Sequence, residues 1–308
     1  MHACKVLKKS VLMSKENELF NKLYLSRTTK GGKQEIFTFR YNCKNMASSS
    51  RIMYSCYAHQ TRENESFVAE HVMTHILAGT MTFRTSGTPM VCEAGDTLLI
   101  KRNQLIKVMK RPPASGGEFK SISIFFDQDT LRNFSVEYNI TADNTYEGPG
   151  IIKLPHDALS STYMASIAPY LNTDAANTEM LTMLKAKEAI LILLRINPQL
   201  KNLLFDFSEP GKIDLEAYMN KHFNFNVEMK RFAYLTGRSL ATFKRDFEKI
   251  FHTSPNRWLQ QKRLKEAYYL IKEKGKKPSD VYMEVGFEDL SHFSFAFKKA
   301  FGTPPSLV

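Results

Sequence analysis

Cysteine is scarce in this chain, which has only four among its 308 residues. They are Cys4, Cys43, Cys56 and Cys92, all in the first third, and no two of them form a CxxC pair or another metal-ligand spacing. Proteins of oxidising compartments use cysteine in paired frameworks that this pattern lacks. The sequence therefore indicates a reduced, cytosolic setting.

Long hydrophobic runs are lacking as well. The N-terminus, MHACKVLKKSVLMS, has no uninterrupted apolar core of the kind that marks a signal peptide. The apolar run Ala189–Ile196 is too short to cross a bilayer. We therefore expect a cytoplasmic protein with no export signal and no membrane contact.

Motifs of catalysis are also missing, since the sequence has no GxSxG, no P-loop, no HExxH and no suggestive Cys/His pair. We therefore predict that the chain is not an enzyme and has no catalytic residues and no cofactor.

Acidic residues are outnumbered by basic ones, 31 to 43, for a net charge of +12. Residues 211–308 hold 18 basic and 11 acidic side chains, whereas residues 1–210 hold 25 and 20. The density of net positive charge is about threefold higher in the C-terminal third. This excess favours polyanionic partners.

Residues 36–126 alternate β-rich segments with turn clusters. The segments are IFTFRYN, HVMTHILAGTMTFRT, DTLLIKR and FKSISIFF, and the turns include SGTP, EAGD (with Gly95-Asp96) and PPASGG. Strand-turn-strand punctuation of this kind predicts an antiparallel sandwich or barrel.

Helical periodicity replaces this pattern over residues 156–172 and 178–196. In the second stretch helical spacing relates Met180, Met183, Leu184, Lys187, Ile190, Leu191 and Leu194. This apolar stripe either pairs with a second copy of the chain or packs on its own β-domain. The Pro- and Gly-containing segment Phe207–Gly211 is interpreted as a linker between two domains, 1–206 and 212–308.

The most informative feature is an internal repeat with a period of 50 residues. FKRDFEKIFHTSP (Phe243–Pro255) aligns with FSFAFKKAFGTPP (Phe293–Pro305), and in both segments the phenylalanines share one helical face. A shorter helix ending in glycine precedes each repeat, at Gly237 and at Gly286. Two helices joined by a glycine turn, the second of them basic on its outer face, form a helix-turn-helix unit.

A single helix is predicted to connect the two units over Pro255–Lys274, with Gly275 just past its end. Its length of roughly 30 Å is close to one turn of duplex DNA. Such a connector could place two second helices in successive major grooves.

From Ile213 to Pro305 the sequence resembles the AraC/XylS family of transcriptional regulators, through both glycine-turn units, the connector and GFEDLSHFSFAFKKAFGTPP. Residues 70–126 resemble the cupin-type sensor domain of many members. The resemblance implies an α+β protein: an N-terminal antiparallel, cupin-like β-barrel with a helical segment, and a C-terminal all-α domain of two helix-turn-helix units joined by a long helix. It implies a sequence-specific, DNA-binding transcriptional regulator that works with the transcription machinery, gated by an effector or by homodimerisation.

The first unit presents Lys244 and Arg245 opposite its phenylalanines. Arg245 can contact guanine or hold a phosphate, and Lys244 suits either. On an isolated helix such a face is more often a solvated charged surface, and the repeat and the family pattern favour DNA contact instead. The DNA-binding residues predicted in this unit are Ser239, Ala241, Thr242, Lys244 and Arg245.

The second unit departs from the family, because Phe295 stands where an arginine is usual. Phe295 could touch a thymine methyl, or it could be buried against the other unit or the N-terminal domain. Tyr282 replaces a small alanine and His252 a glycine, which predicts a shifted geometry. The DNA-binding residues predicted here are Ser291, His292, Ser294, Phe295 and Lys298.

His71 and His75 have the HxxxH spacing that would bring two metal ligands together on a helix. Their flanks are β-like, and on a strand these residues lie about 13 Å apart. We therefore predict no metal site and a small organic effector in the β-domain, with Arg40 and Arg84 as candidates to pair with an anion.

Two other function classes remain as alternatives. One is a cupin-type enzyme fused to a DNA-binding tail, and the other is an interaction module whose basic helices bind a protein or RNA. Turnover of a sugar or small acid would favour the first, and the repeated unit with its spacing argues against the second.

Overall fold

The computed structural model describes residues 37–38, 51–61, 64–84, 89–167 and 178–308. Cys4, Cys43, Arg40 and part of the first expected β-segment lie outside these ranges. Cys56 and Cys92 are buried, and the Cys56 thiol donates to Glu118 Oε2 at 3.2 Å. In the part of the chain that is described, no helix has the length and apolar character needed to span a membrane.

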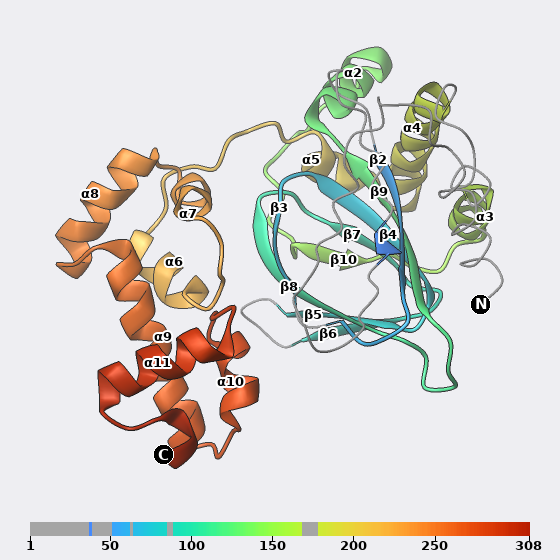
Figure 1. Ribbon diagram of the computed structural model, residues 1–308. Helices are drawn as coiled ribbons and strands as arrows, with labels where there is room; N and C mark the ends of the chain where they lie inside the picture. The colour runs from blue at the N-terminus through green and yellow to red at the C-terminus, as the bar shows by residue number, and fades with distance from the viewer. Residues whose placement is uncertain (1–36, 39–50, 62–63, 85–88, 168–177) are drawn as a thin grey trace, which may run out of the picture. The chain divides into compact units, whose positions relative to one another are not determined.

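Two antiparallel sheets form the N-terminal part (Figure 1), as the strand pattern predicted. The six-stranded sheet has the order β1 (Phe37–Thr38), β2 (Arg51–Tyr57), β9 (Phe119–Phe126), β4 (His71–Ala78), β7 (Thr97–Ile100) and β10 (Ile151–Lys153). The four-stranded sheet has the order β3 (Asn64–Val68), β8 (Gln104–Arg111), β5 (Thr80–Arg84) and β6 (Met90–Glu93). Strand β10 lies beyond the predicted β-region.

The two faces of the six-stranded sheet pack into different cores, because successive side chains on a strand point to opposite sides. Val72 and Leu98 join a buried cluster with Phe83 of the four-stranded sheet. Their neighbours Met73 and Leu99 join a cluster with side chains of the helices. The N-terminal part is therefore layered as helices, six-stranded sheet and four-stranded sheet.

The helices that cover this sheet are α2 (Gln128–Tyr138), α3 (Ala158–Ile167), α4 (Thr178–Ile196), the short 3₁₀ turn η3 (Pro198–Leu200) and α5 (Lys201–Leu204). Those from α3 onward confirm the predicted helical segment. Helix α2 was not predicted. It begins where Asp127 Oδ1 accepts a hydrogen bond from the Thr130 N–H at 2.7 Å, which makes Asp127 the N-cap. The sequence contains this capping residue, but no repeating pattern indicated the helix.

The two histidines lie on strand β4, as predicted. His71 is buried, and its Nδ1 accepts the Arg102 N–H at 3.3 Å. Burial, with the positive charge of Arg102, lowers its pKa to about 3. His75 Nδ1 lies 2.9 Å from Thr97 Oγ1. No group of three or more possible metal ligands occurs among the described residues.

The predicted turn at Gly95-Asp96 is confirmed. Gly95 has a φ of +94°, and the Asp96 carboxylate accepts the Glu93 N–H at 2.9 Å. Arg84, a candidate for anion binding, is exposed at the end of β5.

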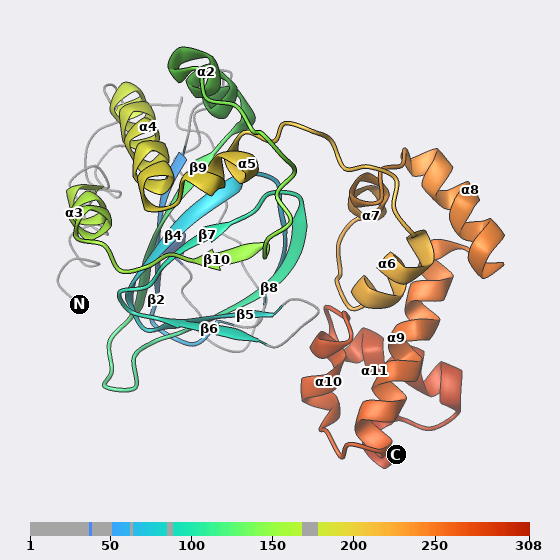
Figure 2. The same cartoon turned by 180° about the vertical axis from the view of Figure 1, so that it is seen from behind.

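The C-terminal part is all helical, as predicted. It contains α6 (Leu215–His222), α7 (Met229–Leu235), α8 (Leu240–Phe251), α9 (Pro255–Lys272), α10 (Pro278–Glu284), α11 (Leu290–Phe301) and a final 3₁₀ turn, η4 (Pro305–Leu307). Figure 2 shows the pairs α7–α8 and α10–α11 along the connecting helix α9. That helix ends near Gly275, which has a φ of +62°.

Candidate nucleic-acid interface

The first helix-turn-helix unit is formed by α7 and α8. Gly237 makes the turn between them with a φ of +65°, which glycine adopts without strain. A Cβ on Gly237 would lie only 2.3 Å from the carbonyl carbon of Gly211. Helix α8 then begins at Ser239, whose Oγ accepts the Thr242 N–H at 3.2 Å. The sequence thus specifies both the turn and the start of the second helix.

Helix α8 is divided into a buried and an exposed face. Phe243 and Phe247 are fully buried, as their spacing predicted. The predicted DNA-binding side chains of Ser239, Ala241, Lys244 and Arg245 are exposed, and that of Thr242 is half-buried, with its hydroxyl 3.0 Å from the Ser239 Oγ.

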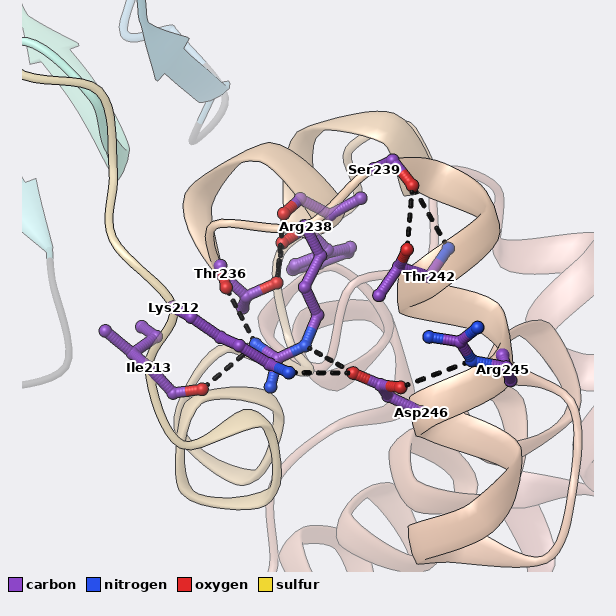
Figure 3. A network of polar contacts seen from close by, with 10 residues as sticks. Lys212, Ile213, Thr236, Arg238, Ser239, Thr242, Arg245 and Asp246 are labelled. Carbon is purple, nitrogen blue, oxygen red and sulfur yellow. Dashed lines mark hydrogen bonds and ion pairs between the residues drawn. The ribbon is translucent and has the colours of Figure 1, made fainter.

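An ionic network lies beside this exposed face (Figure 3). Arg238 Nε donates to Asp246 Oδ2 at 3.1 Å, and its Nη1 donates to the carbonyls of Thr236 and Ile213 at 2.7 and 3.0 Å. Arg245 Nε lies 3.7 Å from Asp246 Oδ1. The carboxylate of Asp246 is thus shared by a nearly buried arginine and an exposed one.

The charge state of Asp246 follows from these neighbours. The hydrogen bond from Arg238, with the charges of Lys212, Arg238 and Arg245, lowers the pKa of its carboxyl. Asp246 therefore stays ionised at neutral pH, with the charge of Arg245 beside it on the surface of α8.

The second unit is formed by α10 and α11. Gly286 makes its turn with a φ of +96°, and Asp289 Oδ1 caps α11 by accepting the His292 N–H at 2.8 Å. Phe293 and Phe297 are fully buried, as the repeat predicted.

Tyr282 and His252 are accommodated without loss of either unit. Tyr282 is buried in the same cluster as Phe293. His252 ends α8 with a φ of +53°, the left-handed conformation that a glycine would adopt, and its N–H donates to the Glu248 carbonyl at 2.9 Å.

The exposed face of α11 carries Ser291, His292, Phe295 and Lys298. Phe295 is 69% exposed, so it is not buried against the first unit. The Ser294 hydroxyl donates to the Leu290 carbonyl at 2.8 Å and is half-buried. Phe295 also borders a hollow of about 290 Å³ that Gln260 and Gln261 of α9 help to line.

Sequence reasoning missed the partners that hold these helices. Arg238, Asp246 and Asp289 were not singled out, although Arg238 directly follows the turn glycine and Asp289 precedes the repeat. The roles of Arg238 and Asp246 depend on a contact between elements, which helical spacing does not encode, whereas the cap at Asp289 is local to α11.

Comparison with known families places both parts of the chain. Residues 232–308 match the model of a helix-turn-helix domain. Residues 71–204 match the model of the ExsA N-terminal regulatory domain.

The chain is similar to curated proteins along most of its length. It is 25% identical to the HTH-type transcriptional regulator ExsA of Pseudomonas aeruginosa over 75% of this chain and 83% of that protein. It is 24% identical to the thermoregulatory protein LcrF of Yersinia pestis over 75% of this chain and 86% of that protein. Among solved structures, an apo ToxT variant from Vibrio cholerae covers 86% of this chain and 98% of its own, with 11% identity and a TM-score of 0.43.

Proposed function

Because this chain belongs to the AraC family of DNA-binding transcriptional regulators, we propose that both of its helix-turn-helix units read one DNA site. The observation that carries this proposal is the pair of exposed helix faces, on α8 and α11, that one connecting helix presents. Each face lies opposite buried phenylalanines, so it is available to a major groove.

The first unit contacts DNA through Ser239, Ala241, Thr242, Lys244 and Arg245. Exposure of Lys244 and Arg245 side by side on α8 supports this assignment. Arg245 reads a guanine through its two-pronged guanidinium, and Lys244 neutralises a phosphate.

The second unit contacts DNA through Ser291, His292, Ser294, Phe295 and Lys298. Its exposed phenylalanine supports an apolar contact with a thymine methyl, and Lys298 supports a phosphate contact. The hydroxyl of Ser294 is already engaged with its own helix, so this residue supplies less directional readout.

A fragment of residues 207–308 is expected to bind duplex DNA by itself, because both units and α9 lie within it. Each phosphate that it neutralises should contribute roughly −0.9 to the slope of log affinity against log salt. A binding titration at several salt concentrations measures this slope. A folded fragment that binds no duplex at low salt would show that the assignment is wrong.

The N-terminal residues, up to about 206, form the regulatory domain in this proposal, and residues 207–211 are the linker. We propose that the two sheets form a cupin-like barrel whose interior takes a small organic effector. The apolar side chains between the sheets support a ligand of this kind rather than an ion. Metal analysis of the purified protein tests this, because stoichiometric zinc, iron or manganese would contradict it.

A homodimer through α4 is the second part of this regulatory proposal. Met180, Leu184 and Leu191 are exposed, the last two at 54% and 44%, and they lie along one side of the helix. Ile190, which the spacing placed in the same stripe, is buried with Leu193 on the side that packs on the sheet. The exposed stripe supports pairing with a second copy.

Replacing both Leu184 and Leu191 with glutamate is expected to give a folded monomer. The two carboxylates would be buried in the dimer interface but solvated in the monomer. Sedimentation velocity measures the mass. Ile190→Glu serves as the matched control and is expected to misfold, since this residue is fully buried. If the variant with both leucines replaced is folded and still dimeric, α4 is not the dimer interface.

The remaining parts of the proposal follow from regulation of transcription. The protein acts in the cytoplasm, contacts the transcription machinery and catalyses no reaction. Its relatives are transcriptional regulators, which supports this role. Selection of bound duplexes from a random pool, mapped on the source genome, identifies the target genes.

A further inference from the structure

The two helix-turn-helix units meet at a compact place, which we call the joint. It consists of the loop Phe223–Asn226 before α7, Arg263 of α9, and the turn Gly286–Glu288 before α11. The loop belongs to the first unit and the turn to the second.

Arg263 connects the two units directly. Its Nε and Nη2 donate to the carbonyls of Phe223 and Phe225, both at 2.8 Å, while its Nη1 donates to the carbonyl of Gly286 at 2.9 Å. A planar guanidinium holds its donors in a fixed fork. Three bonds in different directions therefore fix the loop of one unit against the turn of the other.

The backbones of the two units also meet without a side chain between them. A Cβ added to Gly286 would lie 2.7 Å from the Asn224 carbonyl oxygen and 3.0 Å from Arg263 Nε. A further bond crosses the joint, from Asn226 Nδ2 to Glu288 Oε1 at 2.6 Å. The turn that starts the second recognition helix is thus seated on the first unit.

Arg263 lies where α9 passes from one core to the other. Leu259 packs in the cluster of Phe243 and Phe247, whereas Leu264 packs in the cluster of Phe293. Arg263 is the residue between these two anchors whose side chain bonds to both units. Rotation of one unit about α9 would break bonds to the carbonyls on one side.

We propose that Arg263 is a positioning residue that fixes α8 and α11, the two recognition helices, in one orientation relative to each other. The protein then accepts a single spacing between the two boxes of its site, which are the base-pair segments that these two helices contact. This inference rests on the proposed function. One inserted base pair moves a box by about 3.4 Å and turns it by about 34° around the duplex. A fixed joint cannot follow both changes.

The test uses the full chain and the duplex obtained by random-pool selection. One series of probes has one base pair added or removed between the two boxes, and one further probe keeps only the first box. The variants are Arg263→Ala and Arg263→Lys. Lys265→Ala is the matched control, because it removes a positive charge from an exposed position of the same helix.

The wild-type chain is expected to lose about tenfold or more in affinity for each altered spacing, a loss of about 1.4 kcal/mol by the tenfold conversion. Arg263→Ala should weaken binding at the native spacing and flatten the dependence on spacing, while its affinity for the one-box probe stays at the wild-type value. Arg263→Lys should fall between the two, because one ammonium cannot reach all three carbonyls. Lys265→Ala should keep the wild-type dependence on spacing.

A spacing dependence that is unchanged in Arg263→Ala would overturn the proposal, and so would an equal loss on the one-box probe, which indicates a merely structural role. If circular dichroism shows that Arg263→Ala does not fold, Arg263→Lys decides, and a wild-type profile in that variant overturns the proposal. Absence of any specific duplex binding by the wild-type chain would instead overturn the proposed function.

Discussion

Gly237→Ala is expected to unfold the first helix-turn-helix unit and to abolish sequence-specific DNA binding. Two effects combine at this residue. A non-glycine residue is strained at a φ of +65°, and the new methyl group would lie 2.3 Å from backbone atoms of Gly211. Strain and overpacking together cost about 3 kcal/mol or more. Backbone atoms cannot swing aside as a flexible side chain can.

The measurement is urea unfolding followed by the fluorescence of Trp258, the only tryptophan in the sequence. Its ring centroid lies 4.6 Å from that of Phe251 and 5.6 Å from that of Phe247, so its emission reports on the core of the first unit. Binding of the selected duplex is measured in parallel.

Two further glycines separate the causes. Gly275 has a φ of +62° but open space where a Cβ would be, so Gly275→Ala should show the strain alone, about 1 kcal/mol. Gly211→Ala should behave as wild type, because its Cβ would also meet open space. If Gly237→Ala unfolds at the same urea concentration as Gly275→Ala, the close approach of Gly211 contributes nothing.

Arg245→Ala is expected to relax the base preference at one position of the DNA site, because the first unit should read most of the sequence. A docked arginine-to-guanine contact contributes about 1–3 kcal/mol of discrimination. Phe295→Arg should instead tighten binding without regard to sequence and steepen the salt slope by about 0.9, since it adds one phosphate contact. The measurement is a titration across single-base changes of the site at several salt concentrations.

Phe295→Ala is the control for this comparison, because it removes the exposed ring without adding charge. It should lower affinity modestly and change preference at a thymine only. If Arg245→Ala leaves every base preference intact while Phe295→Ala abolishes specificity, the roles of the two units are reversed.

Several parts of the fold could be predicted because their causes are local. Helical spacing of phenylalanines, with a glycine turn before each run, specified α8 and α11 to within a few residues. Strand alternation predicted β4, β5, β7 and β9 in the same way. A period of 3.6 or 2 residues can be recognised in the sequence itself, without knowledge of any distant contact.

Other elements escaped prediction because distant contacts decide them or because their local signal is weak. Strand β2 pairs with β9 along its whole length, with Arg51 opposite Phe125 and Tyr57 opposite Phe119, a pairing that joins residues more than 60 positions apart. Helix α2 is short and is signalled by one capping aspartate rather than by a repeating stripe. A local pattern indicates that a strand can form, but it does not indicate which strand pairs with it.

The candidate site divides in the same way. The sequence alone determined that α8 and α11 each expose a basic face. The phenylalanines of each helix must be buried, so the opposite face is exposed. Only the tertiary structure decided that Phe295 is exposed, that Asp246 holds Arg238 and Arg245 together, and that Arg263 ties the two units. Exposure and hydrogen-bond partners depend on which elements contact each other in space. The spacing of residues along the sequence does not specify those contacts.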